Sequence, residues 1–365
     1  MKTRPVHVVG GGLAGTECAF QLAEHGVPVV LWEMRPDRST PAHRTGNLAE
    51  LVCSNSLRSD DPEHAAGLLK REMERFGSLV ISAARGAAVP AGSALAVDRD
   101  RFAESITRAI ELSDLIEIRR NEVTEIPSGE VVIASGPLTS PRLSEVLTTV
   151  LGEASLHFYD SIAPIVDGDS LDMSDLYWAS RYGKGGDDYL NVPLDREQYL
   201  AFHRDVCDAE VVPLRDFEQN LFFEGCLPLE EMARRGVDTL RFGPMKPVGL
   251  ERSDGSRPYA VIQLRRESLA ENHFNLVGFQ TRLKWPEQKR IFRQLPGFSN
   301  ATFIRLGQVH RNTFVNAPRH LDRSYRLKGR PRIRLAGQIT GVEGYLESAA
   351  TGLMAAIYTV LERSG

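Results

Sequence analysis

Residues 6–17 read Val-His-Val-Val-Gly-Gly-Gly-Leu-Ala-Gly-Thr-Glu, and this stretch predicts the fold around which the chain is organised. The β-branched run at 6–9 is typical of a buried strand, and apolar residues follow the glycines at helical spacing. Gly10, Gly12 and Gly15 match the G-x-G-x-x-G spacing of a dinucleotide-binding turn between a strand and a helix. The stretch therefore predicts an α/β, Rossmann-like domain.

Each glycine of the turn has a separate physical task. Gly10 permits the tight turn, Gly12 lets a pyrophosphate approach the backbone, and Gly15 lets the helix and the strand pack closely. Bound phosphates would accept hydrogen bonds from the N–H groups at the start of the helix. Glu33 follows a second apolar strand at 28–32 and is the expected partner of a ribose hydroxyl. The alternative is a glycine-rich turn without a ligand.

Length and composition limit the classes to which the protein can belong. A chain of 365 residues forms two domains, or one domain with a large insertion, and 42% hydrophobic residues supply a full core. The four cysteines contain no C-x-x-C pair, so a disulfide framework is not expected and a reducing cytoplasm fits best. A charged start followed by a strand, without any long apolar run, predicts neither an export signal nor a membrane span.

The charge of the chain is segregated along the sequence. The net charge is −4, but residues 231–335 hold 22 Lys and Arg against 8 Asp and Glu. The remaining residues hold 22 basic and 40 acidic side chains. Such segregation indicates a face that binds a polyanion on an otherwise acidic body. The alternative is a set of solvated strands and loops whose charges pair with acids elsewhere.

Changes of pattern divide the chain into three segments. Residues 1–154 alternate strands and helices, with amphipathic helices expected at 62–78 and 99–112. In residues 155–330 the helical pattern thins and short strands alternate with Gly/Pro turns, which predicts an inserted mixed α+β domain rich in antiparallel strands. Residues 331–365 return to a strand, a glycine loop and an apolar helix. They are expected to complete the first domain and to aim a second helix N-terminus at the cofactor.

Cys53 and Cys226 are the candidate reactive thiols, since each lies at a loop or turn. A buried, inert cysteine is the alternative for each, because a thiol becomes a nucleophile only near cations or a helix terminus. Cys18, on the core face of the first helix, and Cys207, in a polar helical stretch, are expected to be structural. His310 has no second ligand at a fixed spacing, so no metal site is expected.

Four motifs carry a specific resemblance: residues 10–17 (GGGLAGTE), 33–36 (EMRP), 51–60 (LVCSNSLRSD) and 337–345 (GQITGVEGY). Together they resemble the bacterial folate- and FAD-dependent tRNA (uracil-5-)-methyltransferases, relatives of the larger flavoproteins that modify the wobble uridine. The Cys-Ser-Asn-Ser motif and residues 222–228 (FFEGCLP) favour the methyltransferase branch. The resemblance covers essentially the whole chain.

The resemblance implies an enzyme that makes 5-methyluridine in the T-loop of tRNA. 5,10-Methylenetetrahydrofolate would give the one-carbon unit, FAD would carry and reduce it, and NADPH or NADH would supply the electrons. Cys226 would add as a thiolate to C6 of uracil, and Cys53 would help to activate the base or handle protons, with the two roles open to exchange. C5 of uracil is a poor nucleophile until a thiolate adds at C6, and a stacked base must first be turned out into a pocket.

The resemblance also implies which residues hold the cofactor and the RNA. The expected FAD contacts are Gly10, Gly11, Gly12, Leu13, Ala14, Gly15, Glu33, Met34, Arg35, Gly337, Gln338, Ile339, Gly344 and Tyr345. The basic excess suits a track for the RNA backbone. The candidate RNA contacts are Lys246, Arg265, Arg266, Arg282, Lys284, Arg311, Arg319 and Arg323.

Members of that family continue past the helix expected to end near Leu361, whereas this sequence ends at Gly365. The further stretch would complete the flavin domain or a subunit interface. Three alternatives to a tRNA methyltransferase therefore stay open: the same chemistry on ribosomal RNA, a flavin-bound RNA-binding protein without catalysis, and a flavin oxidoreductase of small molecules.

Replacing the thiol of Cys226 separates the chemistry from cofactor binding. We expect Cys226→Ala to lose 5-methyluridine formation, because no thiolate would add to C6, while the protein stays yellow with bound flavin. Product analysis on an unmodified tRNA transcript and the visible spectrum of the protein give the two readouts. A colourless Cys226→Ala protein would instead show that the residue is structural.

Overall fold

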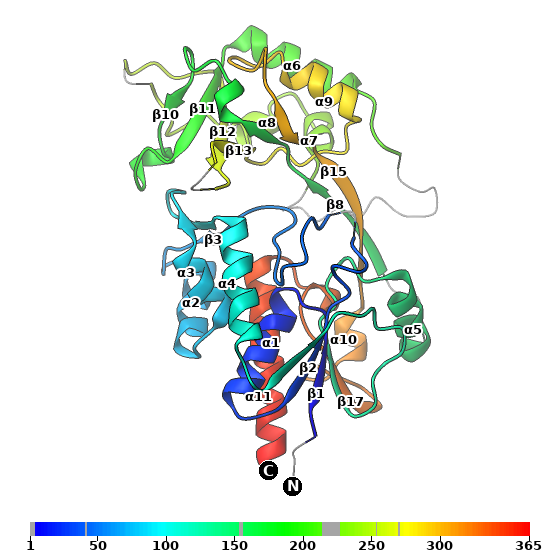
Figure 1. The fold of residues 1–365 in the computed structure, drawn as a ribbon. Helices are drawn as coiled ribbons and strands as arrows, with labels where there is room; N and C mark the ends of the chain where they lie inside the picture. The colour runs from blue at the N-terminus through cyan, green and yellow to red at the C-terminus, as the bar shows by residue number, and fades with distance from the viewer. Residues whose placement is uncertain (1–3, 41, 153–155, 214–226, 253, 269–270) are drawn as a thin grey trace.

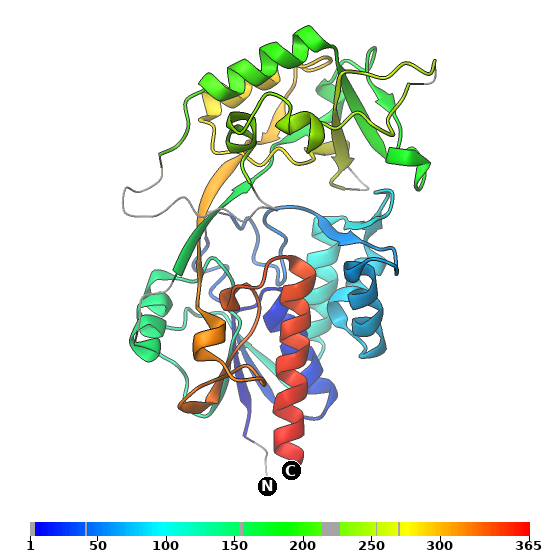
Figure 2. The ribbon, with the colours of Figure 1, turned by 180° about the vertical axis from the view of Figure 1, so that it is seen from behind.

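The computed structural model describes residues 4–40, 42–152, 156–213, 227–252, 254–268 and 271–365. Two lobes are joined by a long two-stranded ribbon (Figure 1). The lower lobe in Figure 1 holds both the N-terminal strands and the C-terminal helix, and the reverse view shows the same division (Figure 2). This arrangement confirms the predicted Rossmann-like domain with an insertion.

The lower lobe is built around a six-stranded sheet in the order β16-β17-β7-β1-β2-β6. The strands are β1 (Val6–Val9), β2 (Val29–Trp32), β6 (Ile116–Arg119), β7 (Glu130–Ile133), β16 (Arg326–Leu327) and β17 (Arg330–Leu335). Neighbouring strands are parallel except for β16 and β17. The valines of β1 are almost fully buried, because helices cover both faces of the sheet.

Helices from opposite ends of the sequence cover one face of this sheet. α1 (Leu13–Glu24) and α11 (Tyr345–Ser364) pack against each other there, whereas α5 (Pro141–Leu151) packs on the other face. The long C-terminal helix and the N-terminal strand–turn–helix therefore belong to one domain. Among the described residues, no helix has both the length and the apolar character needed to cross a lipid bilayer.

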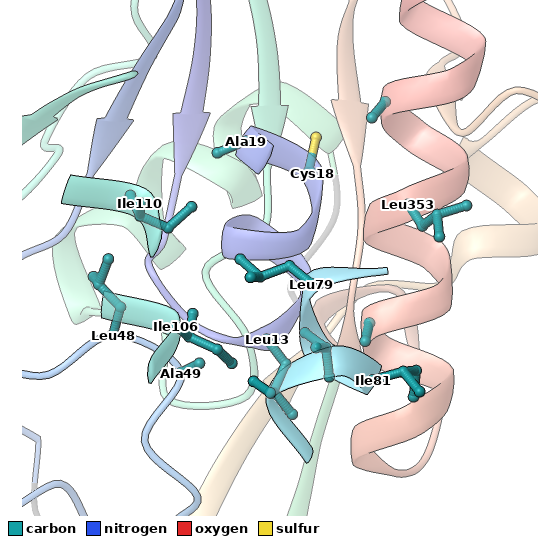
Figure 3. Packing of buried hydrophobic residues seen from close by; sticks show 14 of the residues in the cluster. Leu13, Cys18, Ala19, Leu48, Ala49, Leu79, Ile81, Ile106, Ile110 and Leu353 are labelled. Carbon is teal, nitrogen blue, oxygen red and sulfur yellow. The ribbon is translucent and has the colours of Figure 1, made fainter. Parts of the chain in front are cut away.

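The contact between α1 and α11 is unusually close. A Cβ atom placed on Gly352 would lie 2.1 Å from the carbonyl oxygen of Ala14, so only glycine fits between the two helices. Around this contact, Leu13, Cys18 and Leu353 belong to one continuous apolar cluster (Figure 3). Burial raises the pKa of Cys18 to about 12, which keeps it a thiol and agrees with its predicted structural role.

A smaller, three-stranded sheet in the order β3-β5-β4 extends the lower lobe. Its strands and the helices around it are β3 (Ser56–Ser59), β4 (Ala88–Val89), β5 (Ala94–Val97), α2 (Ala65–Arg75), α3 (Leu79–Gly86) and α4 (Arg99–Glu111). The last of these confirms the helix predicted at 99–112. The helix predicted at 62–78 begins only at Ala65, because the Asp61 carboxylate accepts a hydrogen bond from the Glu63 N–H at 3.0 Å and holds the preceding residues in a turn.

A buried carboxylate ties α3 to α1. Oε2 of Glu17 accepts hydrogen bonds from Oγ of Ser78 at 2.8 Å and from the N–H of Val80 at 2.9 Å. Both donors stand at the N-terminus of α3, where a negative charge complements the helix dipole. Burial nevertheless raises the pKa of Glu17 above its usual value.

The upper lobe is the predicted α+β insertion. Its sheet has the order β10-β11-β12-β13-β9-β14, and all the recorded pairs are antiparallel. The strands are β9 (Ile165–Asp167), β10 (Tyr177–Trp178), β11 (Tyr189–Leu194), β12 (Ala260–Arg266), β13 (His273–Leu276) and β14 (Phe303–Arg305). The helices are α6 (Arg196–Asp208), α7 (Leu229–Arg234), α8 (Thr239–Phe242) and α9 (Trp285–Phe292).

The connecting ribbon marks where the insertion begins and ends. It pairs β8 (Leu156–Ile162) with β15 (Gln308–Phe314) in antiparallel register. After the ribbon, Val315 and Leu321 already belong to the core of the lower lobe, as does α10 (Ala317–His320), through Ala317. We therefore propose that the insertion ends near residue 315, earlier than the boundary at 330 that the change of sequence pattern predicts.

Gly352→Ala tests the close approach of the two helices. Alanine is normally better than glycine inside a helix by about 1 kcal/mol, but here its Cβ would overlap the Ala14 carbonyl. We expect the free energy of unfolding to fall by about 2 kcal/mol, measured by urea denaturation. The control is Gly86→Ala in α3, where a Cβ would meet no atom within 4 Å and stability should hold or rise. Equal effects of both substitutions would contradict this account.

Candidate active site at the carboxyl ends of the parallel strands

A cavity opens where the parallel strands of the lower lobe end, which is where open α/β sheets bind their ligands. It is bounded by the glycine turn after β1, the end of β2, the turn after β7 and the start of α11. The residues that line it are 9–14, 32–35, 121–123 and 134–140, with Thr40, His43, Glu50, Val52, Leu143, Gly337, Gln338, Tyr345 and Ser348.

The glycine turn has the geometry that its sequence predicts. Gly10 has a φ of +109°, and a Cβ there would lie 2.4 Å from the carbonyl oxygen of Ala134. A Cβ on Gly15 would lie 1.8 Å from the carbonyl oxygen of Gly10, so this glycine permits the close contact of α1 with the sheet. A Cβ on Gly12 would meet no atom within 4 Å, and Gly12 lines the cavity. The turn thus leaves one position where a ligand can approach the backbone.

Glu33 holds the glycine turn in place. Its carboxylate accepts hydrogen bonds from the N–H of Gly11 at 2.9 Å and from the N–H and Nε of Arg35 at 3.0 and 2.9 Å. Burial alone would raise the pKa of Glu33, but the bonds from Arg35 outweigh it and the pKa lies below its usual value. Sequence spacing predicts a ribose contact for this acid. The structure adds a different task, because both of its oxygens already hold the protein's own groups.

The glycine loop before α11 returns to the same cavity. Gly337, Gln338 and Tyr345 line it. Ile339 does not, since its side chain is fully buried in the core on the α5 face of the sheet. Gly344 does not line it either; with a φ of +109° it forms the start of α11, where a Cβ would collide with the side chain of Glu347.

The turn at 134–137 lines the cavity, and the sequence predicts it, since an Ala-Ser-Gly-Pro turn after a strand is expected where a returning strand passes a bound nucleotide. Several other lining residues have no signal in the sequence. Residues 121–123 and 138–140 reach the cavity only because they follow β6 and β7, which lie in the same parallel sheet as β1. Thr40, His43 and Glu50 come from the loop after β2. Spacing along the chain does not identify such residues, because the order of the strands in the sheet differs from their order in the sequence.

Cys53 lies beside this cavity, at the junction of the two lobes. Its chain neighbour Val52 and its hydrogen-bond partner Tyr345 both line the cavity. The hydroxyl oxygen of Tyr345 accepts hydrogen bonds from the N–H groups of Cys53 at 2.7 Å and Ser54 at 3.3 Å. Sγ of Cys53 lies 3.7 Å from the carbonyl oxygen of Ser161 on the ribbon. The two motifs at 51–60 and 337–345, far apart in sequence, therefore meet at this thiol.

Guanidinium groups from both lobes hold the backbone of Cys53. Its carbonyl oxygen accepts hydrogen bonds from Arg99 of α4 at 3.1 Å and from Arg305 of β14 at 3.4 Å. Arg99 also forms an ion pair with Glu267, which follows β12. The nearby cations that a reactive thiol needs, which the sequence alone does not reveal, are thus present.

The polar residues after Cys53 explain the Cys-Ser-Asn-Ser motif. Arg265 donates hydrogen bonds to Oδ1 of Asn55 and to Oγ of Ser54, both at 2.8 Å. Asn55 is fully buried, and its amide donates to the carbonyl oxygens of Val97 at 2.9 Å and Arg266 at 3.0 Å. These side chains fasten the loop of the lower lobe to strand β12 of the upper lobe.

The structure corrects two of the predicted RNA contacts. Arg265 is 6% exposed and engaged with the Cys53 loop, so it does not present its charge to an RNA phosphate. Arg282 is 9% exposed and forms ion pairs with Glu230 and Glu231. Arg265 and Arg282 therefore bind other parts of the protein, as the alternative to a polyanion-binding face predicts.

The remaining RNA candidates differ in their surroundings. Lys284 pairs with Glu210 at 2.6 Å, and the guanidinium of Arg266 lies 5.3 Å from the ring centroid of Trp178. Lys246 is half-buried, whereas Arg319 and Arg323 are exposed. Arg311 lies on β15, and its side chain is outside the described part of the chain, as is the whole of Cys226. The roles of these residues stay predictions.

Comparisons with known proteins agree with the motifs. A family model described as glucose inhibited division protein A matches residues 5–365. The protein named methylenetetrahydrofolate--tRNA-(uracil-5-)-methyltransferase TrmFO from Geobacter sulfurreducens is 59% identical over 358 residues, which is 97% of this chain and 82% of that protein. Its namesake from Enterococcus faecalis is 55% identical over 356 residues, with the same two coverages of 97% and 82%.

Solved structures show a similar fold. Two crystal forms of Aquifex aeolicus GidA match with TM-scores of 0.74 and 0.75 at 18% sequence identity. Both matches cover 100% of this chain, which spans 64% and 66% of the two solved chains. At this identity the likeness concerns the fold, and it confirms the Rossmann-like architecture.

Gly12→Val tests the assignment of the cavity to the dinucleotide. We expect the variant to purify without flavin, because the valine side chain would occupy the path of the pyrophosphate beside the start of α1. The visible spectrum of the purified protein gives the measurement. Thermal unfolding of the flavin-free forms of both proteins is the control and should agree, since a Cβ at this position meets no protein atom within 4 Å. Full flavin content in the variant would place the cofactor elsewhere.

Proposed function

We propose that this chain, which belongs to the glucose inhibited division protein A family, methylates C5 of a uridine in tRNA with methylenetetrahydrofolate as the one-carbon donor. The observation that carries this conclusion is the 53–59% identity, over nearly the whole chain, to relatives that bear the name of that enzyme. The protein is an FAD-dependent methyltransferase, with NAD(P)H as its reductant. We further propose the T-loop of tRNA as the position of the uridine.

The cavity suits FAD on physical grounds. Helices α1 and α11 both begin at glycines that carry no side-chain cap, and N–H groups at such helix starts bind phosphate oxygens. Oε1 of Glu122, which lines the cavity, is buried and has no hydrogen-bond partner among the described residues, so it can accept a bond from a hydroxyl or amino group. Once bound, FAD supplies the electrons that turn the transferred carbon into a methyl group.

Two thiols would carry out the chemistry on the base. We assign Cys226 to the addition at C6, where its thiolate forms a C–S bond and moves electron density to C5. C5 can then form its bond to the incoming carbon. To finish, a base must remove the proton from C5, and the electron pair of that C–H bond restores the C5–C6 double bond as the C–S bond breaks.

We propose Cys53 as that base. It adjoins residues that line the cavity, and it is held from both lobes by hydrogen bonds to its backbone N–H and carbonyl groups. A proton acceptor must keep a constant position, because proton transfer depends on hydrogen-bond reach between the two heavy atoms. The dense bonding of residues 53–55 supports this role better than that of a surface cysteine.

We place the reaction in the cytoplasm. Its tRNA substrate and the free thiols of Cys18, Cys53 and Cys207 fit a reducing compartment. The uridine of a folded tRNA would have to leave its stack to reach a thiol at the lobe junction.

An assay with defined transcripts tests the proposal. The purified protein, with FAD, methylenetetrahydrofolate and NADPH, should form 5-methyluridine in an unmodified tRNA transcript, measured by nucleoside analysis. A transcript in which the T-loop uridine is replaced by cytidine is the matched control and should gain no methyl group. Product on ribosomal RNA alone would identify the other RNA as the substrate. NADPH oxidation stimulated by small acceptors but not by tRNA would instead identify a general oxidoreductase.

A further inference from the structure

Arg305 is a partly buried cation beside Cys53. Its two terminal nitrogens donate long hydrogen bonds to the carbonyl oxygens of Val52 at 3.3 Å and Cys53 at 3.4 Å. Its Nε is buried and has no hydrogen-bond partner among the described residues. Within the same residues, no carboxylate lies at ion-pair distance from it, and burial, followed by repulsion from Arg99, lowers its pKa to about 10.

A guanidinium in this state calls for an explanation. Burying part of a charged group is costly unless the charge is paired, and groups with perturbed pKa values cluster at functional sites. Two backbone carbonyls at 3.3 and 3.4 Å compensate only part of that cost. We therefore expect that the anion which pairs with Arg305 is a group other than an Asp or Glu side chain.

The charged groups around Cys53 identify that anion. Arg99 is paired with Glu267, and burial raises the pKa of the Tyr345 phenol, which stays neutral. The guanidinium of Arg305 lies beside Cys53 through its hydrogen bond to the Cys53 carbonyl oxygen, and Arg44 adds a further positive charge close to Arg305. The Ser161 carbonyl oxygen, 3.7 Å from Sγ, favours the thiol, and Glu50 lies beside Arg44. Against these stand the guanidinium groups of Arg99 and Arg305 on the Cys53 carbonyl and that of Arg265 on Ser54, which favour a negative charge on the sulfur.

We propose that Arg305 is a positioning residue that keeps Cys53 in its thiolate form. This inference rests on the proposed function, in which Cys53 takes the proton from C5 of the methylated uracil. In that step the C5–H bond breaks and an S–H bond forms on Cys53. The released electron pair forms the C5–C6 double bond, and the pair of the breaking C–S bond returns to Cys226. A thiol at position 53 would already hold a proton and could not accept another.

Alkylation of Cys53 measures its charge state without any turnover. Iodoacetamide labels thiolates, so the labelling rate as a function of pH reports how much thiolate is present, and peptide mass spectrometry assigns the label to Cys53. We expect Arg305→Met to move the labelling profile up by about one pH unit or more, which slows labelling about tenfold at pH values below the midpoint of the profile. Arg305→Lys, which keeps the charge, should stay close to the original profile.

Arg293→Met is the matched control, because this arginine belongs to the same lobe and is exposed just after α9. Thermal unfolding shows whether each variant is folded; if Arg305→Met is not, Arg305→Gln is compared with Arg305→Lys in its place. A profile for the uncharged variant that overlays the original would overturn the inference. A shifted profile in a protein that methylates no transcript would keep the inference about the thiolate and refute the proposed function.

Discussion

Helix α1 approaches the sheet so closely that a single methyl group on Gly15 would overlap the carbonyl of Gly10, and the position of the site follows from this contact. The contact places the start of α1 over the end of β1, where the cavity opens. α11 packs equally closely against α1, because Gly352 of α11 lies against the carbonyl oxygen of Ala14. Because α11 begins at Tyr345, its placement also brings the Tyr345 hydroxyl to the backbone of Cys53. Two close helix contacts thus join the cavity at the strand ends to a thiol.

The loop around Cys53 is shared between the lobes. Tyr345 and Arg99 hold it from below, whereas Arg265 and Arg305 reach it from strands of the insertion. Buried charges are retained in such places only when hydrogen bonds offset the loss of water, and most of the donors here find a backbone or side-chain oxygen. The position of the thiol therefore depends on the docking of both lobes, which links the lobe that contains the cavity to the inserted lobe.

The charge of the insertion shows why a count of residues is a weak guide to a surface. Its basic excess is large, yet Arg282 and Lys284 are neutralised by acids of the same lobe, and Arg265 serves the Cys53 loop. A basic side chain that is already paired with a carboxylate of the protein adds little positive potential to a surface that could bind a polyanion. Burial and pairing remove Arg265 and Arg282 from the candidates, and the roles of the other basic groups stay predictions.

The sequence by itself determined the strand, glycine turn and helix at the N-terminus, the parallel sheet, the insertion and the family. These features depend on local backbone requirements, such as the positive φ of Gly10, and on periodic burial, both of which are visible in a short stretch of residues. Only the tertiary structure decided that Glu33 holds the turn, that Arg265 binds Asn55 across 210 residues of sequence, and that Arg305 lies beside Cys53 with no ion-pair partner in the part of the chain that the structure describes. The physical reason is that a side chain's partner is set by which strands and loops become neighbours in space, and spacing along the chain does not carry that information.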